Sequence, residues 1–163
     1  MSFSKLTDLD VMEIQRFQCN RPPMLFIDRI LEAIPGVSAV GMKNFTYNEW
    51  FFPEHYPDDP NVPGFVLVEA MVQVLLMTFL TIPEHTGERT NFVKINEVSF
   101  RKKVIPGDQL LMTATLQKFK RGIATGEVLA SVGGEPKVEG VFTVALPKVL
   151  ETFKPKVQKN AIG

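Results

Sequence analysis

The chain has 163 residues, 45% hydrophobic and 22% charged, which predicts one globular domain rather than a disordered chain. Its 18 basic residues balance its 18 acidic residues, so no net charge draws it to nucleic acid or to an anionic membrane. A single cysteine, Cys19, excludes an intramolecular disulfide, and the N-terminus lacks a signal-peptide pattern. We therefore expect a cytoplasmic protein.

The N-terminal third of the chain predicts short elements separated by turns. Residues 8–17 have an apolar side and a polar side, as in an amphipathic helix, with Thr7 or Asp8 as its cap. Branched and apolar residues then dominate up to the turn signal Pro35-Gly36. We expect strands over 24–34 and 38–46 and a loop over 47–62.

Residues 62–82 are nearly all apolar and are about as long as the roughly 20 residues that span a bilayer. Glu69 and Gln73 lie inside this stretch, and Pro63-Gly64 opens it. A charged group in mid-bilayer costs at least about 2.5 kcal/mol. The sequence therefore favours a buried helix in a globular core over a membrane span.

The C-terminal half changes to the period of strands. Apolar residues alternate from Leu110 to Leu116, the pattern of a half-buried strand. Glycines at 122 and at 133–134 divide the following region into two more strands. With a strand over 91–101, this gives about six strands in all. The last ends near residue 146.

These elements predict an α+β domain over residues 1–147, followed by a basic C-terminal tail over 148–163. A helix that is apolar on every face must be enclosed, and the antiparallel sheet is the one element large enough to enclose it. We expect the sheet to wrap around the long helix.

His55 is the stronger candidate of the two histidines. It lies in a loop stiffened by Pro53, Pro57 and Pro60, which would hold its side chain in one place. An ordinary structural histidine is the alternative. His85 lies in a polar segment and is expected to be a solvent-exposed bystander.

Glu69 is a carboxyl group on the apolar helix. Burial without partners is unfavourable, so it must reach a polar cavity or stay protonated, unless it only fixes packing. Gln73 lies four residues on, on the same helix face, and can hydrogen-bond to it.

A neutral imidazole and a protonated carboxylic acid together suit a β-elimination. The imidazole removes a proton next to a carbonyl, and the acid protonates the leaving hydroxyl. The free amides at the start of the helix, at Gly64, can stabilise the enolate-like oxygen, although a plain helix start explains the same residues. Gly64 and Gln73 are thus candidates for oxyanion or substrate binding. Two scattered histidines and Cys19 make no convincing metal or nucleophile site.

Residues 51–73 read FFPEHYPDDPNVPGFVLVEAMVQ. This run resembles the active-site segment of the bacterial 3-hydroxyacyl-[acyl-carrier-protein] dehydratases. Segments 20–29 (NRPPMLFIDR), 43–49 (KNFTYNE) and 104–110 (VIPGDQL) are similar to other landmarks of that family, in the right order. The resemblance covers about residues 14–146.

The resemblance implies a hot-dog fold and a hydro-lyase that converts 3-hydroxyacyl thioesters on acyl carrier protein to trans-2-enoyl thioesters, without metal or organic cofactor. It implies that His55 and Glu69 are catalytic and that Gly64 supplies the oxyanion amide. It also implies a homodimer whose two subunits share each site, with dimers often assembled into hexamers. Glutamate at position 69 resembles the branch that dehydrates without isomerising.

The chain departs from the family pattern near these residues. Glu54 replaces a usual glycine, Asp58-Asp59 replaces Gly-x, and Asn20 replaces a common histidine. The carboxylates would raise the pKa of His55 and crowd the entrance. Two other functions stay open: a thioesterase on the same fold, and a non-catalytic acyl-binding or assembly subunit.

Acyl carrier protein is acidic, so a basic surface would favour its docking. Two runs are candidates, residues 101–103 (RKK) and residues 118–121 (KFKR). Either run is equally well explained as a solvated set of charges.

Overall fold

Residues 3–153, described by a computed structural model of the protein, form seven strands, four α-helices and one short 3-10 helix. The strands are β1 (Leu6–Leu9), β2 (Arg29–Ile34), β3 (Ser38–Asn44), β4 (Asn91–Phe100), β5 (Gln109–Lys120), β6 (Ile123–Val132) and β7 (Glu135–Ala145). The helices are α1 (Val11–Phe17), α2 (Phe52–His55), α3 (Gly64–Leu80), η1 (Pro83–His85) and α4 (Pro147–Thr152).

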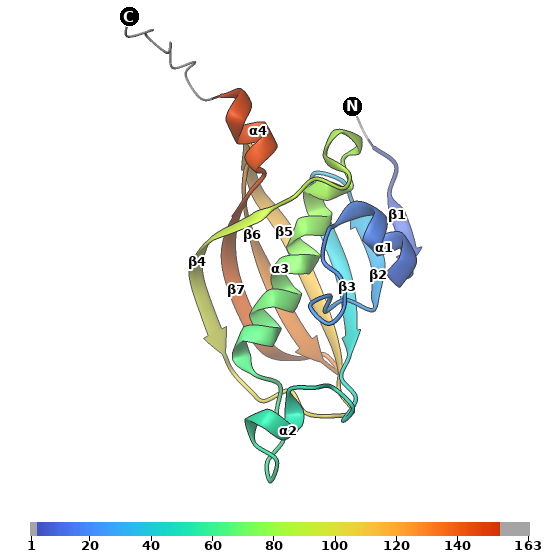
Figure 1. Cartoon of the computed structure of the whole chain (residues 1–163), viewed down its shortest axis with the longest axis vertical. Coiled ribbons are helices and arrows are strands. Elements are labelled where there is room, and N and C mark those ends of the chain that lie inside the picture. Colours follow the sequence, from blue (N-terminus) through green and yellow to red (C-terminus); the bar gives the residue numbers. More distant parts are fainter. Residues whose placement is uncertain (1–2, 154–163) are drawn as a thin grey trace, which may run out of the picture.

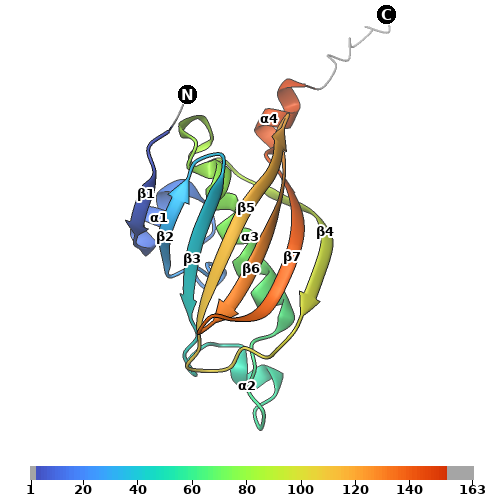
Figure 2. The same ribbon diagram turned by 180° about the vertical axis from the view of Figure 1, so that it is seen from behind.

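The strands form one antiparallel sheet in the order β1-β2-β3-β5-β6-β7-β4. The sheet curls around α3, which lies along its inner face, and β4 is an open edge (Figure 1). Seen from behind, the central strands run in front of α3 (Figure 2). The predicted α+β architecture, with a sheet wrapped around one long helix, is confirmed. The described residues contain seven strands rather than about six.

The additional strand is β1, where the sequence predicted the start of a helix. The helix begins only at Val11, because Asp10 caps it: the Asp10 carboxylate accepts from the amides of Met12 and Glu13. Thr7 and Asp8, the predicted caps, belong instead to β1. Four residues are too few to show a period of two.

Two other boundaries differ from prediction. The strand predicted over 24–34 begins at Arg29, because the backbone of Met24 and Phe26 bonds to a side chain on α3 instead of a neighbouring strand. The first residues of the predicted tail form α4, and its remainder, residues 154–163, lies outside the described residues.

Helix α3 is enclosed as expected, with all but three of its residues buried: Gly64, Phe65 and Glu69. Two glycines on the sheet let it come close. A Cβ atom at Gly41 would lie 2.5 Å from Val74, and one at Gly126 would lie 2.4 Å from Leu75. Across residues 3–153, none of the helices is long and apolar enough to cross a membrane.

Gly126→Val is expected to destabilise the fold by about 3 kcal/mol, because overpacking of a tight core costs about 1–3 kcal/mol. The added side chain would meet Leu75 and also the carbonyl oxygen of Thr115, 2.7 Å from the Cβ position, which cannot rotate away. Urea denaturation measures the change. Gly133→Asn is the control: its Cβ meets nothing within 4 Å, and asparagine tolerates its φ of 56°. Equal stability of the two variants would contradict this view of the packing.

Candidate active site

His55 is the last residue of α2, a short helix that the sequence analysis placed in a loop. Phe52, at the start of α2, is fully buried and anchors it to the core. The His55 Nδ1 atom lies 3.1 Å from the carbonyl oxygen of Asn61. A carbonyl oxygen only accepts, so Nδ1 carries the hydrogen. The neutral ring therefore has its lone pair on Nε2, the nitrogen available as a base.

The segment after His55 is fixed to the strand connection that follows β4. The amide of Val62 donates to the carbonyl of Val104 at 2.8 Å, and Lys103 forms an ion pair with Asp59. These contacts hold Asn61, and through it the His55 ring. Asp59, one of the acidic residues that depart from the family pattern, is thus held in an ion pair with Lys103.

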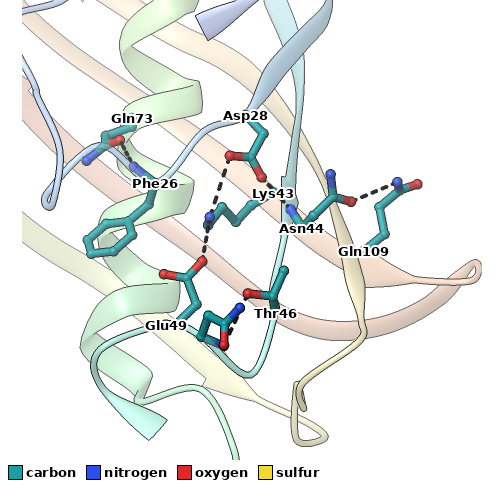
Figure 3. Close-up of polar contacts among 9 residues, drawn as sticks. Phe26, Asp28, Lys43, Asn44, Thr46, Glu49, Gln73 and Gln109 are labelled. Carbon is teal, nitrogen blue, oxygen red and sulfur yellow. Dashed lines mark hydrogen bonds and ion pairs between the residues drawn. The ribbon is translucent and has the colours of Figure 1, made fainter.

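The segment before His55 is fixed by a buried lysine (Figure 3). Lys43, on β3, lies 2.7 Å from Glu49 and 3.5 Å from Asp28. Asp28 also accepts from the amide of Asn44, and the carbonyl of Glu49 accepts from the amide of Phe52 at the start of α2. The network therefore connects the sheet to the helix that carries His55.

Glu69 is the one ionisable residue of α3, and it reaches a cavity, one of the alternatives that the sequence left open. The cavity of about 330 Å³ is lined by polar groups, including Asn20 and Arg89, and by apolar ones, including Val72 and Phe92. The Glu69 side chain is therefore accessible to a small molecule, although most of α3 is not.

Gln73 donates from Nε2 to Glu69 Oε1 at 2.8 Å, the hydrogen bond expected from their spacing. The same nitrogen donates to the carbonyl of Met24. Gln73 Oε1 accepts from the amide of Phe26, as Figure 3 shows. The side chain is fully buried, and both amide hydrogens are used. Gln73 therefore holds the Glu69 carboxyl group in position and is not exposed for substrate binding.

Gly64 begins α3, with Pro63 as the N-cap rather than the first helical residue. The carbonyl of Pro63 accepts from the amides of Val66 and Leu67. Within residues 3–153, the amides of Gly64 and Phe65 have no hydrogen-bond acceptor. A Cβ at Gly64 would lie 3.1 Å from the end of the Phe100 ring, which is closer than an ordinary van der Waals contact. These two amides can donate to an oxygen that develops negative charge.

Within one chain the structure does not bring His55 and Glu69 together. Neither side chain hydrogen-bonds to the other among the described residues, and Glu69 lines a pocket with Asn91 and Phe92, at the start of β4. Gly64 and Asn61 line a different pocket with Phe100, at the end of β4. The candidate groups thus line two different pockets, which reach opposite ends of the edge strand.

His85 differs from expectation. Its side chain is 17% exposed and is not a bystander in solvent. The ring packs edge-on against Phe119, and Nδ1 lies 3.5 Å from Glu88, which also pairs with Lys148 on α4. His85 therefore packs beside the Glu88–Lys148 ion pair, and it is not among the residues that line the Glu69 pocket. In the part of the chain that the structure describes, no group of three or more His, Cys, Asp or Glu side chains is arranged to hold a metal ion.

Sequence reasoning missed the role of Asn20. It was noted only as a departure from a family pattern, yet its side-chain amide donates to Glu69 Oε1 at 3.3 Å. The two residues are 49 positions apart, so no local spacing connects them. The unusual residue type was the one available signal.

Comparison of the sequence with known proteins points to a single family. A family model described as a FabA-like domain matches residues 19–140. The 3-hydroxyacyl-[acyl-carrier-protein] dehydratase FabZ of Clostridium botulinum strain Okra is 40% identical over 140 residues, covering 86% of this chain and 97% of that protein. The protein of the same name from Acetivibrio thermocellus is 41% identical over 135 residues, covering 83% and 92%.

Among solved structures, the dehydratase heterocomplex ApeI:P from Xenorhabdus doucetiae is similar, with a TM-score of 0.72. It is 14% identical in sequence, and the match covers 82% of this chain and 90% of that one. This likeness concerns the fold alone. The family model and the close relatives decide membership: the chain belongs to the FabA-like family and has a hot-dog fold.

Proposed function

We propose that this protein removes water from 3-hydroxyacyl thioesters carried by acyl carrier protein, giving trans-2-enoyl thioesters in fatty acid synthesis. Relatives about 40% identical over most of the chain are named for this dehydration. The structural observation that carries the proposal is the His55–Asn61 hydrogen bond, which leaves Nε2 free as a base. On this proposal the protein acts in the cytoplasm, as its sequence suggested.

In the proposed reaction His55 Nε2 takes a proton from carbon 2 of the substrate, and the freed electron pair forms the double bond to carbon 3. The bond from carbon 3 to its hydroxyl breaks, and Glu69 protonates the departing hydroxyl to give water. The amides of Gly64 and Phe65 donate to the thioester oxygen while it carries charge. His55 ends with one proton more and Glu69 with one fewer, and return of that proton restores both groups. The reaction involves no net oxidation or reduction.

The working unit is a homodimer formed through the edge strand β4. Among residues 3–153 this strand pairs only with β7, and four of its exposed residues are apolar: Phe92, Val93, Ile95 and Phe100. An open edge with apolar side chains favours pairing with another strand. Antiparallel pairing with β4 of a second copy is self-complementary, as a two-fold dimer requires.

Antiparallel pairing supports a site shared by two chains. It sets the end of one β4 beside the start of the other. Gly64 and the His55 segment, near Phe100, would then face the Glu69 pocket of the second copy, near Asn91. The groups that are apart within one chain would form two complete sites in the dimer.

The carrier protein is proposed to dock on the basic run at the β5–β6 turn. Lys118, Lys120 and Arg121 line a depression with the exposed ring of Phe153, and in residues 3–153 none of the three has a carboxylate partner. The other candidate run is neutralised: Arg101 pairs with Glu139, Lys102 with Glu135 and Lys103 with Asp59. Lys102, together with Lys137, lowers the pKa of Glu135 to about 2.

Reversing the charge of the free run should weaken carrier binding. Lys118→Glu with Arg121→Glu is expected to raise KM for a carrier-bound substrate about tenfold at low salt and to leave KM for a short free thioester unchanged. Lys102→Glu, at a position already paired with Glu135, is the matched control and should change neither value. A larger effect from Lys102→Glu would assign docking to the other run.

The proposed function is tested with 3-hydroxyacyl thioesters of several chain lengths. Formation of a conjugated enoyl thioester, followed by its ultraviolet absorbance, is the expected result. Release of free thiol without enoyl product would instead identify a thioesterase. Binding of the thioesters without either product would identify a non-catalytic acyl-binding subunit.

A further inference from the structure

The two oxygens of the Glu69 carboxyl group have different surroundings. Oε1 accepts from Gln73 Nε2 at 2.8 Å and from Asn20 Nδ2 at 3.3 Å. Oε2 receives no N–H or O–H donor from residues 3–153, and Glu69 lines the cavity described above. One oxygen is therefore held by the protein, and the other is left for a ligand.

This asymmetry determines where the acid proton resides. A carbonyl-type oxygen has two lone pairs, and two N–H donors occupy both of those on Oε1. A proton on Oε1 would displace one of the donors. In the acid form the proton therefore resides on Oε2, the oxygen that can reach a leaving hydroxyl.

Gln73 cannot adjust this arrangement. Its Nε2 hydrogens go to Met24 and Glu69, and its Oε1 accepts from Phe26, so rotating the amide would break three hydrogen bonds. Asn20 is the second donor to Glu69 Oε1. It lies after α1, is half-buried, and borders the same cavity.

We propose that Asn20 is a positioning residue for the catalytic acid: its amide occupies the second lone pair of Glu69 Oε1 and so confines the transferable proton to Oε2. The inference rests on the proposed function. The hydrogen bond from Asn20 to Glu69 Oε1 becomes stronger when Glu69 becomes a carboxylate during the elimination, because a charged acceptor forms stronger hydrogen bonds than a neutral one. Asn20 thus acts on the chemical step and not on substrate binding.

Two substitutions of Asn20 distinguish a role as hydrogen-bond donor from a role in filling space. Asn20→Ala is expected to lower kcat for 3-hydroxybutyryl thioester about tenfold, with KM unchanged, which is the scale of one hydrogen bond to a charged group. Asn20→Asp keeps the shape but replaces the N–H donors by an acceptor, so it should lower kcat further. If Asn20 only filled space, Asp would restore turnover and Ala would not, and that order would overturn the proposal.

A double-mutant cycle tests whether Asn20 acts through Glu69. In the Glu69→Gln background, Asn20→Ala should change the residual rate by less than about twofold, because the group it positions is gone. Gln117→Ala is the control, since that amide donates to Glu127 on an exposed part of the sheet, and it should turn over as the unmodified protein does. If the unmodified protein forms no enoyl product, the proposed function fails, and if Glu69→Gln keeps full turnover, the role of Glu69 as the acid fails. If Glu69→Gln loses turnover while Asn20→Ala does not, only the role of Asn20 is overturned.

Discussion

Replacing His55 by alanine is expected to lower kcat for 3-hydroxybutyryl thioester by about 10²- to 10⁴-fold, the usual contribution of a general base. Glu69→Gln should have an effect of the same order. Glutamine keeps the size of the side chain but has no acidic proton to give to the leaving hydroxyl. Neither residue belongs to the buried core, so the folded state should persist. Enoyl absorbance measures turnover, and thermal unfolding checks the fold.

The second histidine provides the matched control. His85→Asn removes a ring that packs edge-on against Phe119 and lies 3.5 Å from Glu88, so it should lower the unfolding temperature without lowering kcat. Turnover near the unmodified level in either His55→Ala or Glu69→Gln would contradict the assigned roles.

Mixing two inactive variants is expected to restore activity. When His55→Ala and Glu69→Gln chains exchange subunits, half of the dimers contain one chain of each kind. If each site combines His55 of one copy with Glu69 of the other, one of the two sites in such a dimer is intact. Activity should then rise from near zero to about a quarter of that of the unmodified protein, as two-fold symmetry requires.

The arrangement of the site decides the outcome of this mixing experiment. A site built within one chain would leave every mixed dimer inactive, so absence of recovery after confirmed subunit exchange would exclude the shared site. Mixing His55→Ala with a second sample of His55→Ala gives the baseline. A β4 variant such as Ile95→Lys, which charges the exposed edge, should prevent the recovery by preventing dimer formation.

The strands were predictable where alternation is regular and not where the ladder is irregular. The regular alternation runs from Leu110 to Leu116, whereas β5 continues to Lys120, because a register shift between Leu116 and Lys118 breaks the period of two. α2 was missed for a different reason. Its single helical turn is held by burial of Phe52, a tertiary contact that leaves no helical period in the sequence.

In the candidate site, the residue that could be identified from the sequence was a polar one in an otherwise apolar helix. Glu69 could be found because a carboxyl group on an apolar helix requires an explanation, and Gln73 followed from helical spacing. Asn20 and the Lys43 network could not be found in this way. Their partners come from distant segments that only the folded sheet brings together.

The close approach of α3 to the sheet also restricts where an acyl chain can lie. Val74 and Leu75 fill the space above Gly41 and Gly126, so no hydrocarbon can pass between the helix and the strands there. On the proposed function, the space open to a fatty chain beside Glu69 is the cavity lined by Val72, Leu76 and Phe92. The side chains at the far end of that cavity then limit the number of carbons accepted, and enlarging them would shorten the preferred substrate.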